Sequence, residues 1–509
     1  MTEAADLLLT DAEVHTLAYP DETHEAVAVR DGRICRVGDA YDLSFLAGVE
    51  TRTVDLDGRV VLPGFVDAHT HLVLTGLQRV HADLSDATSR AEALDRLQAR
   101  ADAVAEGDPV VGFGYDESGW DDPRYLTRAD LDAVDAAGPV VAVREDLHVA
   151  SLDSTALSRF GDAMPDGDVR RADGDPTGVV VEGALDPVFD ALESSDATRE
   201  AVLAAQRYAN ERGVTGVHDM VRRSHAPAVY RDLDRDGRLS LRVRLNYWAD
   251  HLDALVETGL RTNHGTRMVR VGAIKTFTDG SIGARTAKLS EPYADGDETG
   301  EWVVEPDEFR ALLARAEDAG FQVAAHAIGD EAVDAVLAAY ADCDDPEASR
   351  HRLEHLELAS EAALDRLADL GVVASMQPNF HRWAGEGGLY DRRLGDRRTE
   401  TNRVGRLADA DAYLAFGSDG MPLDPLYGVH CAVNAPTPAQ RLGVTDALRA
   451  YTLGAAYAGF DEDRLGTVEA GKRADLVALD RSPWERPAAI DGVDVALTVV
   501  DGDVVYDGR

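Results

Sequence analysis

The hydrophobic pattern of this chain divides it into three parts. Residues 1–61 and 466–509 contain short stretches in which apolar and polar residues alternate, separated by tight-turn dipeptides such as Asp31-Gly32. Alternation with a period of two predicts β-strands with one buried face, and Asp-Gly between two such runs predicts a hairpin. Because chain termini commonly lie close together, the two segments are expected to pair into one small β-sandwich domain.

Between these segments, short apolar runs alternate with long amphipathic stretches rich in alanine, arginine and glutamate. This order predicts an α/β fold of parallel β/α units. Eight of the apolar runs are strand candidates, which suggests a (β/α)8 barrel, or TIM barrel, over residues 62–465. The candidates cover residues 60–66, 214–218, 241–247, 271–277, 322–326, 352–355, 372–376 and 413–419.

The interval between the first two strand candidates is too long for one crossover connection. Residues from about 80 to 200 are therefore expected to form a subdomain inserted into the barrel. Within it, the pattern predicts helices near 89–105 and 126–137 and a strand at 139–143.

The charge of the chain changes what partners can be expected. Its 509 residues include 94 acidic and 51 basic side chains, which gives a formal net charge of -43. A negative surface of this size disfavours nucleic acid and anionic membranes as partners. Only three of the basic residues are lysines, a composition that resembles proteins of salt-accumulating halophiles.

The three cysteines, Cys35, Cys343 and Cys431, form neither a paired framework nor a Cys-x-x-Cys metal motif. The longest apolar runs have the length of strands, so no membrane span is expected. Residues 1–6 lack the basic and apolar segments of a secretory signal, and a cytoplasmic location is the expectation.

One apolar run, residues 60–68, ends in His69-Thr70-His71. Residues two apart on a strand face the same side, so the two imidazoles could bind one metal ion. An isolated His-x-His is more often the solvated end of a strand. Here the other strand candidates end in further potential ligands, namely Lys275, His326, His355 and Asp419.

Each of these residues also has an ordinary structural interpretation. Lys275 could pair with Asp279, His326 could be a hydrogen-bonded core histidine, and Asp419 could be a turn or N-cap residue. Their joint occurrence at the ends of strand candidates one, four, five, six and eight favours a metal site at the carboxyl end of the barrel.

The motifs as a set resemble the amidohydrolase superfamily, and within it the YtcJ-like branch that includes N-substituted formamide deformylases. The resemblance covers nearly the whole chain and rests on Leu62-Pro63-Gly64-Phe65-Val66-Asp67-Ala68-His69-Thr70-His71, Gly213-Val214-Thr215-Gly216-Val217-His218-Asp219, the segment 275–287, His326-Ala327-Ile328-Gly329-Asp330, His351-Arg352-Leu353-Glu354-His355, Ser375-Met376-Gln377-Pro378, Gly417-Ser418-Asp419 and the segment 466–477.

The resemblance implies a centre of one or two divalent metal ions, with zinc as the default. His69, His71 and Asp419 would hold one ion, His326 and His355 a second, and a carboxylated Lys275 would bridge them. The catalytic residues implied are Asp419, Lys275 and His326, and the reaction is hydrolysis of a non-peptide carbon–nitrogen bond, such as that of an N-substituted formamide. Alternatives are a deaminase or cyclic-amide hydrolase, a phosphoester hydrolase, and a non-catalytic regulatory protein.

The substrate is expected to be a small molecule, and the residues expected to bind it lie in two regions. Asp279, Ser281 and Arg285 follow Lys275, where a loop would lie above the barrel mouth. Asp146, His148 and Trp120 belong to the inserted subdomain, where a solvated strand end and a structural aromatic cluster are equally good interpretations. Relatives of this branch are often dimers, which makes a homodimer the corresponding expectation.

Overall fold

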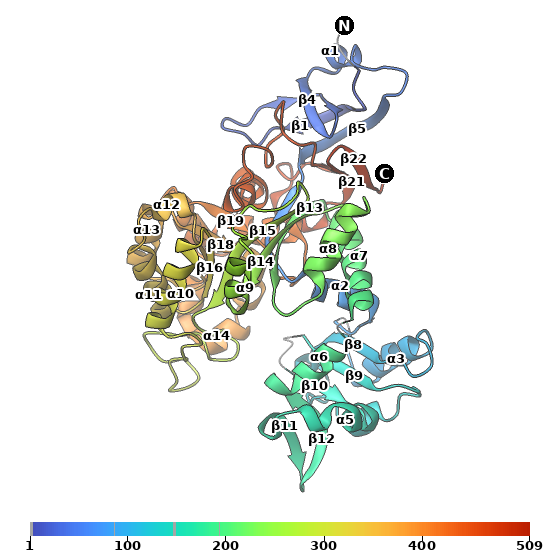
Figure 1. The fold of residues 1–509 in the computed structure, drawn as a ribbon, viewed down its shortest axis with the longest axis vertical. Coiled ribbons are helices and arrows are strands. Elements are labelled where there is room, and N and C mark those ends of the chain that lie inside the picture. Colours follow the sequence, from blue (N-terminus) through green and yellow to red (C-terminus); the bar gives the residue numbers. More distant parts are fainter. Residues whose placement is uncertain (1–3, 86, 146–148, 193) are drawn as a thin grey trace. The chain divides into compact units, whose positions relative to one another are not determined.

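The computed structural model describes residues 4–85, 87–145, 149–192 and 194–509, and the chain forms two compact units (Figure 1). Unit 1 consists of Met1–Leu72, Gln206–Arg223 and Tyr230–Arg509, and unit 2 of Val73–Ala205 and Ser224–Val229. The domain boundaries expected from the sequence stay predictions.

Eight parallel strands in chain order form the barrel of unit 1. Their bounds are β6 (Phe65–Thr70), β13 (Val214–Val221), β14 (Arg242–Trp248), β15 (Val269–Phe277), β16 (Val323–Ala327), β17 (Arg352–His355), β18 (Val373–Met376) and β19 (Leu414–Phe416). The backbone N–H of Asp419, just after β19, donates to the carbonyl of His69 in β6 at 2.8 Å, so the two ends of the sheet lie together. The nearly closed parallel barrel confirms the predicted fold class.

The first strand candidate, 60–66, is in fact parts of two strands. β5 (Arg52–Pro63) belongs to the sheet of the chain ends, and β6 starts the barrel at Phe65. Gly64 separates them, and a Cβ on Gly64 would lie 2.3 Å from a side-chain carbon of Thr215. The close approach of β13 therefore requires glycine where the chain passes from one sheet to the other, a constraint that hydrophobic periodicity does not reveal.

Amphipathic helices accompany the barrel strands. In α11 (Asp330–Tyr340), for example, Val333, Val336, Leu337 and Tyr340 are buried, which is the spacing of one helix face. The helices after β13 are α8 (Ala226–Arg235), α9 (Leu252–Glu257), α10 (Pro306–Asp318), α11, α12 (Pro346–Ser349), α13 (Glu361–Asp369), α14 (Leu389–Leu394), α15 (Val404–Asp409), α16 (Pro425–Val433), α17 (Val444–Arg449) and α18 (Ala455–Ala458).

Strands from both chain ends share one sheet, in the order β22-β21-β20-β5-β1-β3-β4, with β2 paired to β1. The predicted hairpin at Asp31-Gly32 joins β3 to β4, and both turn residues have positive φ, 52° and 70°. The sequence predicted a sandwich, and the hydrogen bonds join these strands into one continuous sheet. Its strands are β1 (Leu7–His15), β2 (Thr23–His24), β3 (Ala26–Arg30), β4 (Arg33–Gly38), β5, β20 (Leu476–Leu479), β21 (Val495–Val500) and β22 (Asp503–Asp507), and α1 (Ala40–Ser44) follows β4.

Unit 2 contains a six-stranded sheet in the order β11-β12-β10-β9-β8-β7. Its strands are β7 (Ala82–Asp83), β8 (Val110–Tyr115), β9 (Val140–Arg144), β10 (Val149–Leu152), β11 (Val169–Ala172) and β12 (Asp175–Val181). The helices that begin between β6 and β13 are α2 (Leu72–Val80), α3 (Arg90–Ala101), α4 (Arg128–Leu131), α5 (Ser154–Phe160), α6 (Asp186–Leu192) and α7 (Ser195–Glu211).

The helix predicted at 126–137 is only one turn long, α4. Asp130 caps its first turn by accepting from the N–H of Thr127, and Asp132 accepts from the backbone and hydroxyl of Ser154. These aspartates fix the segment to its neighbours in place of continuing the helix, since aspartate favours helix ends over helix interiors.

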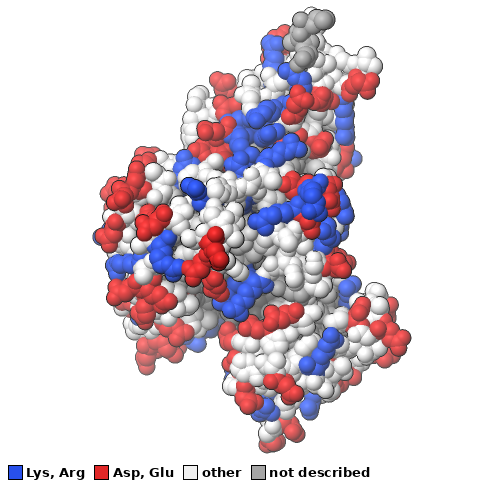
Figure 2. All heavy atoms as spheres, in the orientation of Figure 1, with Lys and Arg blue, Asp and Glu red and all other residues white. Residues whose placement is uncertain are grey.

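Acidic side chains are spread over the visible face of the molecule and are not confined to one segment (Figure 2). A search of the described helices finds none with the length and apolar character needed to cross a bilayer.

Candidate metal centre

The carboxyl ends of five barrel strands bring the six candidate ligands to one end of the barrel, where barrel enzymes carry their active sites. The ring centroids of His69 and His355 are 4.8 Å apart, and those of His326 and His355 are 4.4 Å apart. The six residues are His69 in β6, His71 directly after it, Lys275 in β15, His326 in β16, His355 at the end of β17 and Asp419 after β19.

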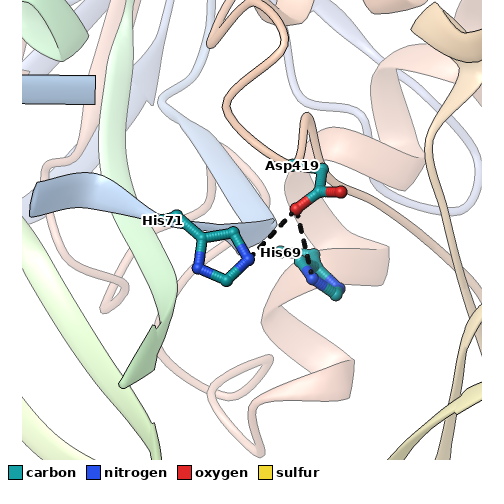
Figure 3. A group of neighbouring side chains, drawn as sticks. All are labelled: His69, His71 and Asp419. Carbon is teal, nitrogen blue, oxygen red and sulfur yellow. Dashed lines mark ion pairs between the residues drawn. The ribbon is translucent and has the colours of Figure 1, made fainter. Parts of the chain in front are cut away.

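Three of these residues form a group with the spacing of a metal site (Figure 3). One oxygen of Asp419, Oδ1, lies 3.6 Å from Nε2 of His69 and 3.3 Å from Nε2 of His71. Burial alone would raise the pKa of Asp419, but the hydrogen bond with His71 and the charges of His69, His71 and Lys275 lower it below the usual value. The carboxylate therefore stays ionised, which is the form that binds a cation.

Hydrogen bonds on the far side of each ring fix which nitrogen faces the site. Nδ1 of His69 donates to Oε2 of Glu354 at 2.6 Å, and Nδ1 of His355 donates to Oε1 of Gln377 at 2.7 Å. In His326 it is Nε2 that lies 3.0 Å from the carbonyl oxygen of Gly280. Since carbonyl and carboxylate oxygens only accept, the opposite nitrogen of each ring keeps its lone pair for a ligand.

The buried histidines are held in the neutral form that metals require. Burial, with the charge of Lys275 nearby, lowers the pKa of His69 well below its usual value and that of His326 to about 3. For His355, burial is again the largest cause, followed by the neighbouring rings of His326 and His69. Neutral imidazoles can accept a cation without first losing a proton.

Lys275 is fully buried, and its Nζ has no hydrogen-bond partner within the ranges that the structure describes. Burial lowers the pKa of this amine to about 8. An unpartnered amine in the interior is costly, unless a further group completes its environment. The orphaned amine, the ionised Asp419 and the converging imidazole lone pairs together fit a divalent metal centre.

A buried ion pair supports the ligands from behind. Arg352 is fully buried in β17 and donates from Nε to Oε1 of Glu354 at 2.7 Å, and also to Nδ1 of His218 at 2.8 Å and to the carbonyl of Ala68 at 2.6 Å. Glu354 in turn holds His69, so the guanidinium compensates the carboxylate that orients a ligand.

The supporting roles of Arg352, Glu354 and Gln377 do not emerge from the sequence. A signal was present for the first two, because Arg352 and Glu354 alternate on a strand whose side chains should be buried, where charges must be paired.

Comparisons with known proteins decide the family. The model of the family described as the amidohydrolase family matches residues 52–506. The chain belongs to the amidohydrolase family. It is 32% identical to a putative amidohydrolase, YtcJ, of Bacillus subtilis, over 97% of this chain and 98% of that protein. It is 28% identical to the N-substituted formamide deformylase of Arthrobacter pascens, over 100% of this chain and 99% of that protein.

A solved structure supports the same assignment. The crystal structure of an uncharacterized metal-dependent hydrolase from Pyrococcus furiosus is 31% identical, covers 94% of this chain and 99% of its own, and has a TM-score of 0.80. These relationships confirm the predicted family and make this chain a metal-dependent hydrolase of the amidohydrolase family.

The loop after β15 of this amidohydrolase contains the predicted substrate residues Asp279, Ser281 and Arg285. Asp279 is buried and accepts from the backbone N–H groups of Lys288, Ile328 and Gly329 at 2.8–3.1 Å, so its carboxylate holds the loop to the strand end. Arg285 donates to Asp295 at 2.9 and 3.0 Å, and Ser281 accepts from the N–H of Ala284. Their contact with substrate stays a prediction.

In unit 2 of the amidohydrolase, Trp120 is only 6% exposed; its ring stacks on Tyr115 and its indole N–H donates to the carbonyl of Ala87 at 2.9 Å. These contacts place it in the core of unit 2, and its role toward substrate stays a prediction. Asp146 and His148 lie outside the described residues.

A second group, Glu317, Cys343 and His351, also has ligand atoms close together. Here Nδ1 of His351 accepts from the N–H of Val323 at 3.0 Å, so Nε2 carries the proton and donates to Glu317 at 3.1 Å. Burial and Glu317 also raise the pKa of Cys343 to about 12, which disfavours the thiolate. Both nitrogens of this histidine are in use, and the group does not fit a metal.

Proposed function

We propose that this amidohydrolase uses zinc to cleave a non-peptide carbon–nitrogen bond of a small amide, with an N-substituted formamide as the first candidate. The observation that carries the proposal is the convergence of neutral imidazoles, an ionised Asp419 and the orphaned Lys275 at the carboxyl end of the barrel. The likeness to a full-length N-substituted formamide deformylase supports this substrate class.

Each ligand has a proposed place in the centre. His69, His71 and Asp419 would hold one ion, and His326 and His355 would offer Nδ1 and Nε2 to a second. Lys275 lies between the two groups and would bridge them as a carbamate, formed when Nζ binds carbon dioxide and releases a proton. That reaction needs the neutral amine, which a pKa of about 8 makes available near neutral pH.

When bound, zinc supplies a Lewis acid that polarises the scissile carbonyl and acidifies a coordinated water. Asp419 accepts a proton from the attacking water as the new carbon–oxygen bond forms at the carbonyl carbon. It then donates that proton to the nitrogen as the carbon–nitrogen bond breaks, which releases an amine and a carboxylic acid. Glu354 holds the ring of His69 in one orientation throughout.

Aromatic rings beside the ligands support an apolar substituent on the substrate. Phe277 stacks on His326 with a centroid separation of 4.3 Å, and Trp248 lies 5.3 Å from Phe277 and 6.3 Å from His71. On the other side, Phe380 stacks parallel to His355 at 6.2 Å and contacts Trp383. Apolar walls with a few polar groups are typical of small-molecule sites.

Product release from a panel of N-substituted formamides, larger N-acyl amines and cyclic amides tests the proposal. The assay should contain zinc and molar salt, because mutual repulsion among the acidic side chains is screened there. Formate and amine in equal amounts, released only from the formamides, are the expected result.

Turnover of a cyclic amide or of a deaminase substrate alone would keep the metal chemistry and discard the formamide substrate. Hydrolysis of none of these amides, with turnover of a phosphoester, would contradict the proposed bond class. Asp419→Asn provides the control, since it keeps the size of the side chain and removes the proton acceptor.

A further inference from the structure

A cavity of about 20 Å³ lies at the opposite end of the barrel from the ligands. Strands β6, β13, β14 and β15 contribute to it near their amino ends, and the segment that follows α18 covers it. Its charged lining consists of Arg242, Arg244, Arg270, Arg464 and Asp461. Four guanidinium groups around one carboxylate are unusual in a chain whose net charge is -43.

Asp461 is the only carboxylate among the residues that line this cavity, and it is fully engaged. Its Oδ2 accepts from Arg244 at 2.8 Å, and its Oδ1 accepts from Arg464 at 2.7 Å and from Arg270 at 3.1 Å. Three positive charges therefore share one negative charge.

The next charges outward do not restore the balance. Arg242 pairs with Asp475 and Asp501, but Asp501 is also shared with Arg267 at 3.1 Å and Arg473 at 3.0 Å. In the whole cluster six arginines face three aspartates. The imidazole of His218 does not change the sum, because burial and the neighbouring arginines lower its pKa and keep it neutral.

The arginines are affected by this surplus. Burial lowers the pKa of Arg244 and of Arg270 below the usual arginine value, and other arginines of the cluster add to the effect. The bonds of Arg270 use Nε and Nη1, and those of Arg464 use Nε and Nη1. In this part of the chain, which the structure describes in full, Nη2 of both residues is left to donate to another group.

We infer that this cavity binds one small monovalent inorganic anion, such as chloride, which completes the arginine cluster and stabilises the amino-terminal end of the barrel. The volume admits a particle the size of one water molecule or a little larger, and excludes organic anions. Because residues at this end of a barrel serve stability and not catalysis, the ligand is structural.

A comparison of anions at equal ionic strength tests the inference. The thermal midpoint of the full-length protein is measured in sodium chloride and in sodium gluconate at the same sodium concentration. A ligand that binds only the folded state raises the midpoint as its concentration exceeds the dissociation constant. The expected result is a higher midpoint in chloride, and a rise that continues with the logarithm of the chloride concentration.

Two variants localise the effect. Arg270→Gln removes a cavity arginine whose side chain is 26% exposed, and it should abolish the difference between chloride and gluconate. Arg406→Gln is the matched control, since Arg406 is also 26% exposed and pairs with Glu361 and Asp365 on another part of the barrel. The control should keep the full chloride effect.

If Arg270→Gln does not fold, the wild-type protein still decides the matter. Crystals grown with sodium bromide should give an anomalous peak in the cavity, beside the guanidinium groups of Arg270 and Arg464. A cavity that holds water only, or equal midpoints in chloride and gluconate, would overturn the inference.

Discussion

The hydrogen bond between Glu354 and His69 provides the sharpest test of how the centre is supported. Replacing Glu354 with glutamine keeps the size of the side chain and an acceptor oxygen, but it removes the negative charge at 2.6 Å from Nδ1. Both side chains are at most 1% exposed, so solvent does not screen the interaction. Charge-assisted hydrogen bonds contribute about 1.5–3 kcal/mol.

Converted to affinity, this range corresponds to a loss of about 10- to 150-fold in the binding of zinc. Outer partners of metal ligands typically cost about 10–100-fold when removed, which agrees with the value worked from the bond. The dissociation constant of zinc should be measured by competition with a chelator of known affinity, and the fold of the variant should be checked by circular dichroism.

Glu317→Gln is the matched control for this experiment. Glu317 also accepts from a buried histidine, His351, at 3.1 Å, but that ring does not belong to the centre. We expect its zinc affinity to equal that of the wild type. A folded Glu354→Gln variant with unchanged affinity would refute the supporting role of Glu354, and equal losses in both variants would point to general loosening of the barrel.

Three further predictions concern other parts of unit 1. Lys275→Ala should lower zinc content and reduce turnover by more than about 100-fold, since it removes a ligand and not an outer partner; full metal content and activity, measured by elemental analysis and rate, would exclude the bridging role. Trp248→Ala should raise KM about 3- to 10-fold for amides with aromatic N-substituents and leave kcat and small substrates unaffected, because aromatic contacts contribute about 0.5–1.5 kcal/mol; equal effects on all substrates would contradict the apolar wall. Burial raises the pKa of Glu357 to about 7, so ionisation of this carboxyl costs stability as pH rises from its unfolded value to 7. Glu357→Gln should therefore gain thermal midpoint relative to the wild type between pH 5 and 7 and stay level above that range, and a flat difference across all pH values would disprove the assignment.

The sign of the Glu357 effect follows from proton counts. Between the unfolded pKa near 4.5 and the folded value of about 7, the folded state binds more protons than the unfolded chain, so wild-type stability falls as pH rises. Glutamine does not titrate and shows no such fall.

Strand periodicity and ligand spacing predicted much of this fold from residues alone. The eight barrel strands and the hairpin at Asp31-Gly32 appear where apolar runs and turn residues place them. The break at Gly64 was missed, because it depends on Thr215 of a neighbouring strand and not on local hydrophobicity. The short α4 was missed for a related reason, since Asp132 bonds to a residue 22 positions away.

The candidate centre shows the same limit. His69, His71 and Asp419 could be grouped because strand ends of a barrel converge, and the structure places them together. The pairing of Arg352 with Glu354, and of Glu354 with His69, is decided by side chains on neighbouring strands whose register the sequence does not specify. The arginine cluster at the other barrel end was missed because its members come from residues 242 to 501.

Zinc titration of the metal-free protein tests the central claim most directly. Chelated protein should show no release of formate from an N-substituted formamide, and activity should return in proportion to zinc added, reaching a plateau at one or two ions per chain. Asp419→Asn should stay inactive at every zinc concentration. Full turnover without bound metal, or a chain that rebinds no metal, would contradict the account.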